Sequence, residues 1–234
     1  MFKIYKMKIL CCGDSHIEVF GYCNKKQNNF VFDVCKVGGA TAQGAVNPNS
    51  KTDALNIFIK KINSTRADKI LIMLGEVDCG FLIWVRCKRY NISIDDQLNL
   101  SVKNLFKFVD NIIETENYTN KDIIICGSLL PTIRDSTDKK FLNGARSQVD
   151  VSQLERTKKT IEYNNLLKIN CDKYGYNYIE IVNDIIGKDG TVKDEFLNSN
   201  HNDHHLNKEK TYKLWLSKIE NILLSDNLNI CNKD

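Results

Sequence analysis

The stretch Ile9-Leu10-Cys11-Cys12-Gly13-Asp14-Ser15-His16 indicates which fold this chain adopts. Its first half is a short apolar run, typical of a strand buried on both faces of a parallel sheet. A turn at Gly13 follows, and Ser15 lies within it. Ligands bind at the carboxyl ends of the strands in such sheets, so this turn aims a hydroxyl at a binding edge. Taken alone, however, the serine would more simply cap the N-terminus of a following helix.

Apolar runs and helical spacings alternate along the rest of the chain. Strands are expected at residues 8–12, 30–37, 69–74, 122–126 and 176–181, and helices at 15–22, 50–64, from 93 or 95 through 112, at 152–174 and from 208 onward. This alternation indicates βαβ units. We therefore expect an α/β protein with three layers, α/β/α, around a flavodoxin-like, doubly wound parallel sheet of about five strands. No repeat or linker divides the sequence, which predicts one domain over residues 1–234.

Two segments between these elements carry further expectations. Ser50, with Asp53 three residues later, suits the N-terminus of the second helix. Residues 132–150 are polar and show no strong period. Long segments of this kind are often functional, so we expect a loop or a lid over the site.

All four histidines of the chain fall within residues 15–16 and 201–205. A serine in the first stretch and a histidine with a nearby carboxylate in the second are the parts of a serine nucleophile system. Ser15 is the candidate nucleophile, and His205 is the candidate general base. Asp203 precedes that histidine by two residues and could orient and stabilise its imidazole.

Other unusual residues also follow predicted strands. Gly39 comes after the second strand, and Glu76 and Asp78 come after the third. The amides of Ser15 and Gly39 are candidate donors to the oxyanion of an acyl-transfer reaction. Asp14 is expected to be a hydrogen-bonding residue of the turn. Asp78 is either a loop cap or salt-bridge partner, or a structural residue of the site.

The chain resembles the SGNH (GDSL-type) hydrolase superfamily in four stretches that occur in the family's order. These are Gly13-Asp14-Ser15, Gly39-Ala40-Thr41, Gly75-Glu76-Val77-Asp78 and His204-His205-Leu206-Asn207. The resemblance covers nearly the full chain and implies an esterase or O-acyltransferase with a Ser-His-Asp mechanism. It further implies small O-acyl esters, acetyl esters on a carbohydrate above all, as substrates. Water as acceptor gives hydrolysis and a sugar hydroxyl gives transfer, and the residues leave that choice open.

Two positions depart from the family pattern. Val77 stands where the family has an asparagine that donates to the oxyanion, and losing such a donor can cost roughly 2.7 to 4 kcal/mol. The family's aspartate usually lies three residues before the histidine, where this chain has Asn202, so Asp203 takes that role with His205. Choosing His204 as the base instead remains an alternative. The valine also motivates a second hypothesis, a degenerate domain that binds a glycan or acyl ligand without turning it over.

Charge and composition exclude several other classes of protein. The 33 basic and 29 acidic residues are interspersed and give a net charge of +4, which predicts no nucleic-acid partner. No stretch approaches the roughly 18 to 20 apolar residues that span a bilayer. The nine cysteines show no C-x-x-C spacing, so we expect reduced thiols, a cytoplasmic protein and no zinc site.

We expect a small-molecule or carbohydrate ester as the partner, with no cofactor and no metal. Adjacent histidines rarely reach one ion together, so a metal-dependent phosphoesterase is a weaker alternative. Arg86, which follows the third strand, is a candidate to hold an anionic group of the substrate. The oligomeric state stays open.

Overall fold

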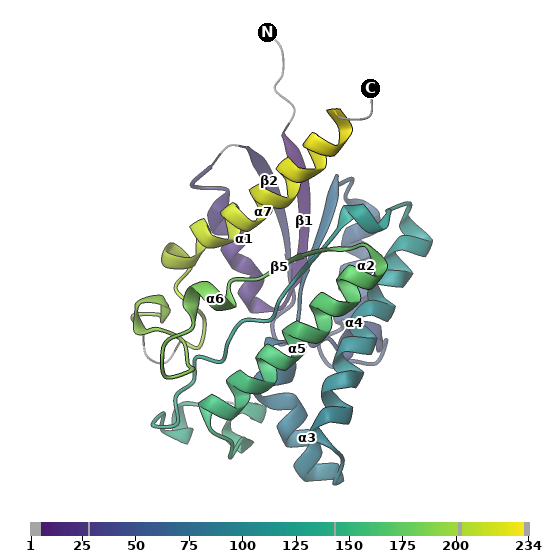
Figure 1. Ribbon diagram of the computed structural model, residues 1–234. Coiled ribbons are helices and arrows are strands. Elements are labelled where there is room, and N and C mark those ends of the chain that lie inside the picture. Colours follow the sequence, from purple (N-terminus) through teal and green to yellow (C-terminus); the bar gives the residue numbers. More distant parts are fainter. Residues whose placement is uncertain (1–5, 28, 143, 201–202, 232–234) are drawn as a thin grey trace.

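The computed structural model describes residues 6–27, 29–142, 144–200 and 203–231, and at its centre lies a parallel sheet (Figure 1). The strands are β1 (Met7–Gly13), β2 (Phe30–Lys36), β3 (Lys69–Met73), β4 (Ile123–Cys126) and β5 (Asn177–Ile179). Their order is β2-β1-β3-β4-β5, and every pair is parallel. This order is that of flavodoxin-like folds and confirms the predicted sheet. Its strand order reverses between β1 and β3, where such folds bind their ligands.

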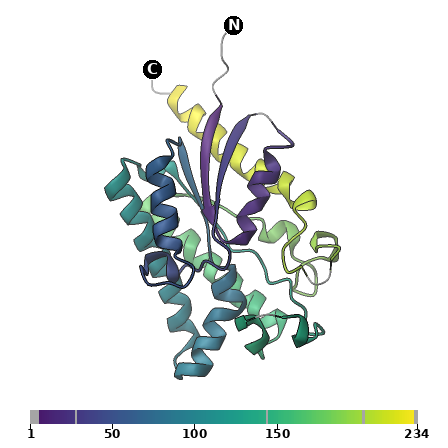
Figure 2. The ribbon, with the colours of Figure 1, turned by 180° about the vertical axis from the view of Figure 1, so that it is seen from behind.

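Helices cover both faces of the sheet. They are α1 (Glu18–Cys23), α2 (Ala54–Ser64), α3 (Ile83–Tyr90), α4 (Ile94–Glu116), α5 (Gln153–Tyr174), α6 (Val182–Ile185) and α7 (Lys208–Cys231). Figures 1 and 2 show α1 and α7 against one face and α2, α4 and α5 against the other, which confirms the three predicted layers. None of the helices in the described part of the chain is long and apolar enough to cross a membrane.

Alternate residues of β1 enter two hydrophobic cores. Leu10 and Cys12 face α2, α4 and α5, whereas Ile9 and Cys11 face α1 and α7. On the second side the fully buried ring of Phe20 lies 5.7 Å from that of Trp215, centroid to centroid. These apolar faces explain why α1 and α7, almost two hundred residues apart, pack on the same side of the sheet.

Helix starts follow the sequence closely in two places. The Ser93 hydroxyl accepts hydrogen bonds from the amides of Asp95 and Asp96 at the start of α4. Ser152 and Glu155 form a reciprocal capping box at the start of α5. The predicted starts of these two helices are therefore confirmed.

Other boundaries differ from those expected. The second helix begins at Ala54 and not at residue 50, because residues 50–53 form a turn and Asp53 takes a left-handed conformation with φ 52°. The first helix starts as a 3-10 turn, Ser15–Ile17. Three further elements lie outside the predicted ones: α3, α6 and the π-helix Asp78–Leu82 that precedes α3. Within the expected loop at 132–150, two 3-10 segments occur, Lys139–Phe141 and Gly144–Gln148.

Candidate active site

The close approach of β1 to β3 sets the position of Ser15. A side-chain carbon at Gly13 would lie 2.4 Å from the Met73 carbonyl oxygen, so only glycine allows this spacing. The chain then turns, and the buried Asp14 accepts hydrogen bonds from both the amide and the ring Nδ1 of His16, each at 2.9 Å. These bonds fix the 3-10 turn that carries Ser15 at the point where the strand order reverses.

Ser15, His205 and Asp203 lie together, as the sequence predicts. The Ser15 hydroxyl is 2.7 Å from His205 Nε2, and His205 Nδ1 is 2.6 Å from Asp203 Oδ1. The His205 amide also bonds that carboxylate oxygen, and Asn198 donates to the other one at 2.9 Å. Spacing by two residues therefore suffices here, because the carboxylate folds back onto both the amide and the ring of the same histidine. His201 and Asn202 lie outside the described residues.

Hydrogen bonds keep Asp203 ionised. Burial would raise the pKa of this carboxyl, but the amide and the ring of His205 outweigh burial and lower the pKa below its ordinary value. The side chains of His205 and Asp203 are 31% and 35% exposed, so the pair is open to a substrate. A charged carboxylate on Nδ1 stabilises an imidazolium that forms when Nε2 takes a proton.

Asp78 binds the glycine-rich loop after β2 through hydrogen bonds from backbone amides of the loop. Gly39 lies in this loop with φ +74°, a left-handed conformation that favours glycine. Asp78 is fully buried and accepts hydrogen bonds from the amides of Ala42 at 2.7 Å and Gln43 at 3.2 Å, and from the Ser101 hydroxyl at 3.0 Å. Burial raises its pKa, and these three donors act against that rise. Its contacts are therefore those of a loop anchor.

Arg86 also braces this loop. Its guanidinium on α3 donates to the Gln43 side-chain oxygen, and the Gln43 amide nitrogen donates in turn to Ser101 at 3.0 Å. The described contacts of Arg86 thus place it on the loop anchor, whereas the sequence suggested a contact with an anionic substrate group.

The amides of Ser15 and Gly39, the predicted oxyanion donors, have no acceptor among the described residues. Each follows the end of a neighbouring strand, β1 and β2. Val77, in contrast, supplies no side-chain donor and is almost fully buried at the start of the π-helix. A π-helix in this place fits the frequent occurrence of such segments at functional sites.

His16 is a charged group that the sequence analysis did not single out. Burial opposes its charge, but Asp14 and Glu76 outweigh burial and raise its pKa to about 9. Glu76 Oε2 lies 3.9 Å from His16 Nδ1 and has no hydrogen-bond partner among the described residues. The sequence contained a signal for a charged His16: it is adjacent to Ser15, and Asp14 and Glu76 both follow predicted strands whose ends meet at the same edge of the sheet.

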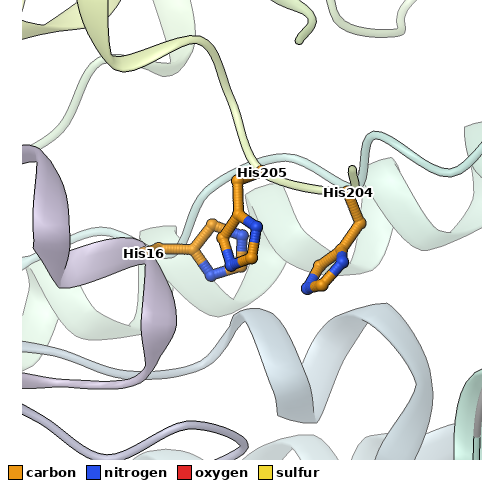
Figure 3. A group of neighbouring side chains, drawn as sticks. All are labelled: His16, His204 and His205. Atoms are coloured by element: carbon orange, nitrogen blue, oxygen red, sulfur yellow. The ribbon is translucent and has the colours of Figure 1, made fainter. Parts of the chain in front are cut away.

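The rings of His16, His204 and His205 lie close together (Figure 3), and the His205 ring contacts the Ser15 hydroxyl. The ring centroids of His204 and His205 are 4.1 Å apart, and those of His16 and His205 are 4.6 Å apart. Burial, followed by the charges of Arg146, His205 and His16, lowers the pKa of His204 to about 3. The Arg146 guanidinium lies 2.8 Å from His204 Nε2, where a neutral His204 ring can accept a hydrogen bond from it.

The same cluster is one of two groups among the described residues that could hold a metal ion, and the other is Asp14, His16 and Glu76. One ring nitrogen from each of His16, His204 and His205 lies within 4.8 Å of the others. However, metal ligands must be deprotonated, and a pKa of about 9 keeps His16 charged at neutral pH. The Arg146 cation beside His204 is a further electrostatic obstacle to a metal ion.

Comparison with solved structures identifies the architecture. A protein proposed to be a platelet activating factor, from Streptococcus pneumonia, matches 94% of this chain and 86% of its own with a TM-score of 0.61 at 14% identity. A GDSL-like lipase from Bacteroides thetaiotaomicron matches 93% and 88% with a TM-score of 0.54 at 8% identity. The chain has the SGNH hydrolase fold.

An acetyl xylan esterase shares this SGNH fold, with a TM-score of 0.55 at 12% identity over 92% of this chain and 98% of its own. No protein-family model and no curated protein matches the sequence. At these identities the likeness concerns the fold, and the functional argument for this SGNH-fold protein rests on its own side chains.

Proposed function

We propose that this protein is a serine-dependent hydrolase of O-acyl esters. The observation that carries the proposal is the unbroken chain of hydrogen bonds from Ser15 through His205 to Asp203, at 2.7 and 2.6 Å. This arrangement is the one that activates a serine hydroxyl, which is a weak nucleophile at its ordinary pKa. The SGNH fold agrees with the proposal, because the structures that share it include lipases and an esterase.

Each step of the reaction has a residue in place. Ser15 Oγ attacks the acyl carbonyl while its proton moves to His205 Nε2, and Asp203 stabilises the imidazolium. His205 then returns that proton to the alcohol oxygen as the ester bond breaks and the acyl group stays on Ser15. Water attacks the acyl-enzyme with His205 as base, which releases the carboxylic acid and restores the serine.

The amides of Ser15 and Gly39 are proposed as the oxyanion donors. Both are free of described acceptors, and preorganised amides stabilise a developing negative charge without reorganisation. The absence of a donor at Val77 reduces the donor set that the family pattern would supply, so we expect turnover to be slower than with an asparagine there.

The proposed substrates are small acyl esters, acetyl esters above all, on an alcohol such as a carbohydrate. Water is the simplest acceptor, and a sugar hydroxyl in its place would make the enzyme an O-acyltransferase. All described cysteines are free thiols, and most of them are buried. We therefore propose a reducing compartment such as the cytoplasm as the place of action.

Labelling with a fluorophosphonate probe and hydrolysis of p-nitrophenyl acetate test the proposal. The wild-type protein should be labelled and active, whereas Ser15→Ala and His205→Ala should show neither property. Ser64→Ala, which removes an exposed hydroxyl at the end of α2, is the matched control and should behave as wild type.

A folded wild-type protein that resists the probe and hydrolyses no ester would refute the proposal. That result would favour a binding domain without turnover, which the valine at position 77 motivates. Activity that a chelator abolishes would instead point to a metal at the histidine cluster.

A further inference from the structure

A cavity of about 410 Å³ reaches the histidine cluster of the proposed active site through Arg146, which lines the cavity and contacts His204. Its walls come from the π-helix, from the segment 132–150 and from the N-terminal part of α5. The volume is within the range of about 300 to 1,000 Å³ typical of small-molecule pockets. The segment expected to be a loop or lid therefore forms much of the wall of a pocket next to the site.

Basic side chains dominate the charge of this cavity. It is lined by four basic residues, Arg134, Lys139, Arg146 and Arg156, and by two acidic residues, Asp135 and Asp150. Several of these charges are already paired. Arg134 bonds Asp194, outside the cavity, and Lys139 bonds Asp150, which also accepts from Lys88 at 2.9 Å. The remaining positive charge belongs to Arg146 and Arg156.

Arg156 is a buried cation with incomplete compensation. It is only 6% exposed, and burial lowers its pKa. Its Nη2 donates to the Ile133 carbonyl at 2.6 Å, but the nearest carboxylate, that of Asp135, is 3.9 Å away. Its Nε is buried and has no hydrogen-bond partner among the described residues. A buried charge in this state is costly unless a further partner arrives.

Arg146 connects the cavity to the histidine cluster. Its guanidinium lies 4.5 Å over the ring of Phe81, and its Nη2 is 2.8 Å from His204 Nε2. Its Nε is likewise buried without a described partner. Contacts run from this arginine through the rings of His204 and His205 to the Ser15 hydroxyl. A molecule whose ester reaches Ser15 could therefore extend to Arg146.

We propose that this cavity binds an anionic group, a carboxylate or a phosphate, on the alcohol part of the ester substrate. The inference rests on the proposed ester hydrolysis and specifies its substrate class as acidic esters, such as acylated acidic sugars. A planar guanidinium matches carboxylate and phosphate oxygens geometrically. Such an anion would neutralise the charge of the Arg146 and Arg156 guanidinium groups, which both line the cavity.

Matched esters that differ only in charge test the inference. An O-acetylated methyl glucuronoside carries the carboxylate, its C6 carboxamide is the neutral counterpart, and O-acetylated glucose 6-phosphate carries a phosphate. Acetate release should give a kcat/KM at least about tenfold higher for one of the two anionic esters than for the carboxamide. A preference for the glucuronoside would identify the anion as a carboxylate, and a preference for the glucose 6-phosphate would identify it as a phosphate. The preference should shrink as salt is added, because ions screen the attraction.

Arginine variants locate the effect. Arg146→Gln and Arg156→Gln should reduce the anionic-to-neutral ratio of kcat/KM to about one, and Arg146→Lys should restore part of it. Lys168→Gln is the control, because it removes the same charge from the exposed side of α5, about 18 Å further along the helix. That variant should keep the ratio. Thermal melting curves verify that each variant is folded.

The outcomes separate this inference from the proposed function. Turnover of all three esters with ratios within about twofold of one would refute the anion site and leave the hydrolase intact. A preference that Lys168→Gln also removes would refute it too. If no ester is turned over, calorimetry with methyl glucuronoside and with inorganic phosphate decides. Binding that Arg146→Gln abolishes supports the site, and the absence of binding to the wild-type protein refutes it.

Discussion

Replacement of His16 by glutamine should make the stability of the protein much less dependent on pH. The pKa of His16 rises from its ordinary value of 6.5 to about 9 in the folded chain. At about 1.4 kcal/mol per pH unit, this rise corresponds to about 3 kcal/mol of folding free energy. The folded state binds the proton more tightly, so this stabilisation is complete below about pH 6.5 and is lost as the pH rises through about 9.

Urea denaturation of wild type and His16→Gln at about pH 6, 8 and 10 measures this contribution. The difference in free energy of unfolding between the two proteins should shrink by about 3 kcal/mol from the lowest to the highest pH. A difference that stays constant across this range would refute the reasoning, since it would mean that Asp14 and Glu76 do not hold a charged imidazole.

His204 offers a control with the opposite sign. Its pKa is lowered to about 3, so the folded state binds its proton more weakly than the unfolded chain does. The stabilisation from a neutral His204 is present above about pH 6.5 and is lost as the pH falls toward 3. The difference between wild type and His204→Gln should therefore decrease on acidification, where that for His16→Gln does not.

Three further substitutions test other parts of the structure. Asp203→Asn should lower kcat by up to about 10⁴-fold with little change in KM, because the imidazole loses its charged partner, and an unchanged rate would exclude the proposed acid. Gly75→Ala should destabilise the protein by about 1 to 3 kcal/mol in urea, since a side-chain carbon there would lie 2.4 Å from the ring of Tyr163 and φ is +129°; wild-type stability would contradict that contact. Ser152→Ala should cost about 1 kcal/mol through the loss of the cap on α5, and an unchanged midpoint would show that the capping box contributes nothing.

The sheet and the central site contacts were accessible from the sequence because they depend on local patterns. Apolar runs that end in glycine or acidic residues located β1, β2 and β3, and parallel pairing then brings their carboxyl ends together. The positions of the four histidines were enough to predict that Ser15 lies near the segment 201–205. Ser93 and Ser152 predicted the starts of α4 and α5, because serine is strongly preferred at the N-cap of a helix.

The remaining features depend on tertiary contacts that no local pattern encodes. Asp53 adopts a left-handed conformation, which L-residues disfavour, within a turn, and α2 therefore begins only at Ala54. The raised pKa of His16 depends on Asp14 and, in part, on Glu76, sixty residues away, and the lowered pKa of His204 depends partly on Arg146. The contact of Arg86 with Gln43 is likewise a tertiary one, and the hydrogen bond from the Gln43 amide distinguishes between the two roles that the sequence left open for Asp78.

The 190 residues between Ser15 and His205 have a consequence for the nascent protein. At about 5 to 20 residues per second, the ribosome adds the histidine roughly 10 to 40 s after the serine. During that interval the proposed nucleophile lacks its proposed base, so we expect its hydroxyl to be a weak nucleophile. On the proposed mechanism, the serine is activated only after synthesis has passed His205 and α7 has packed against α1.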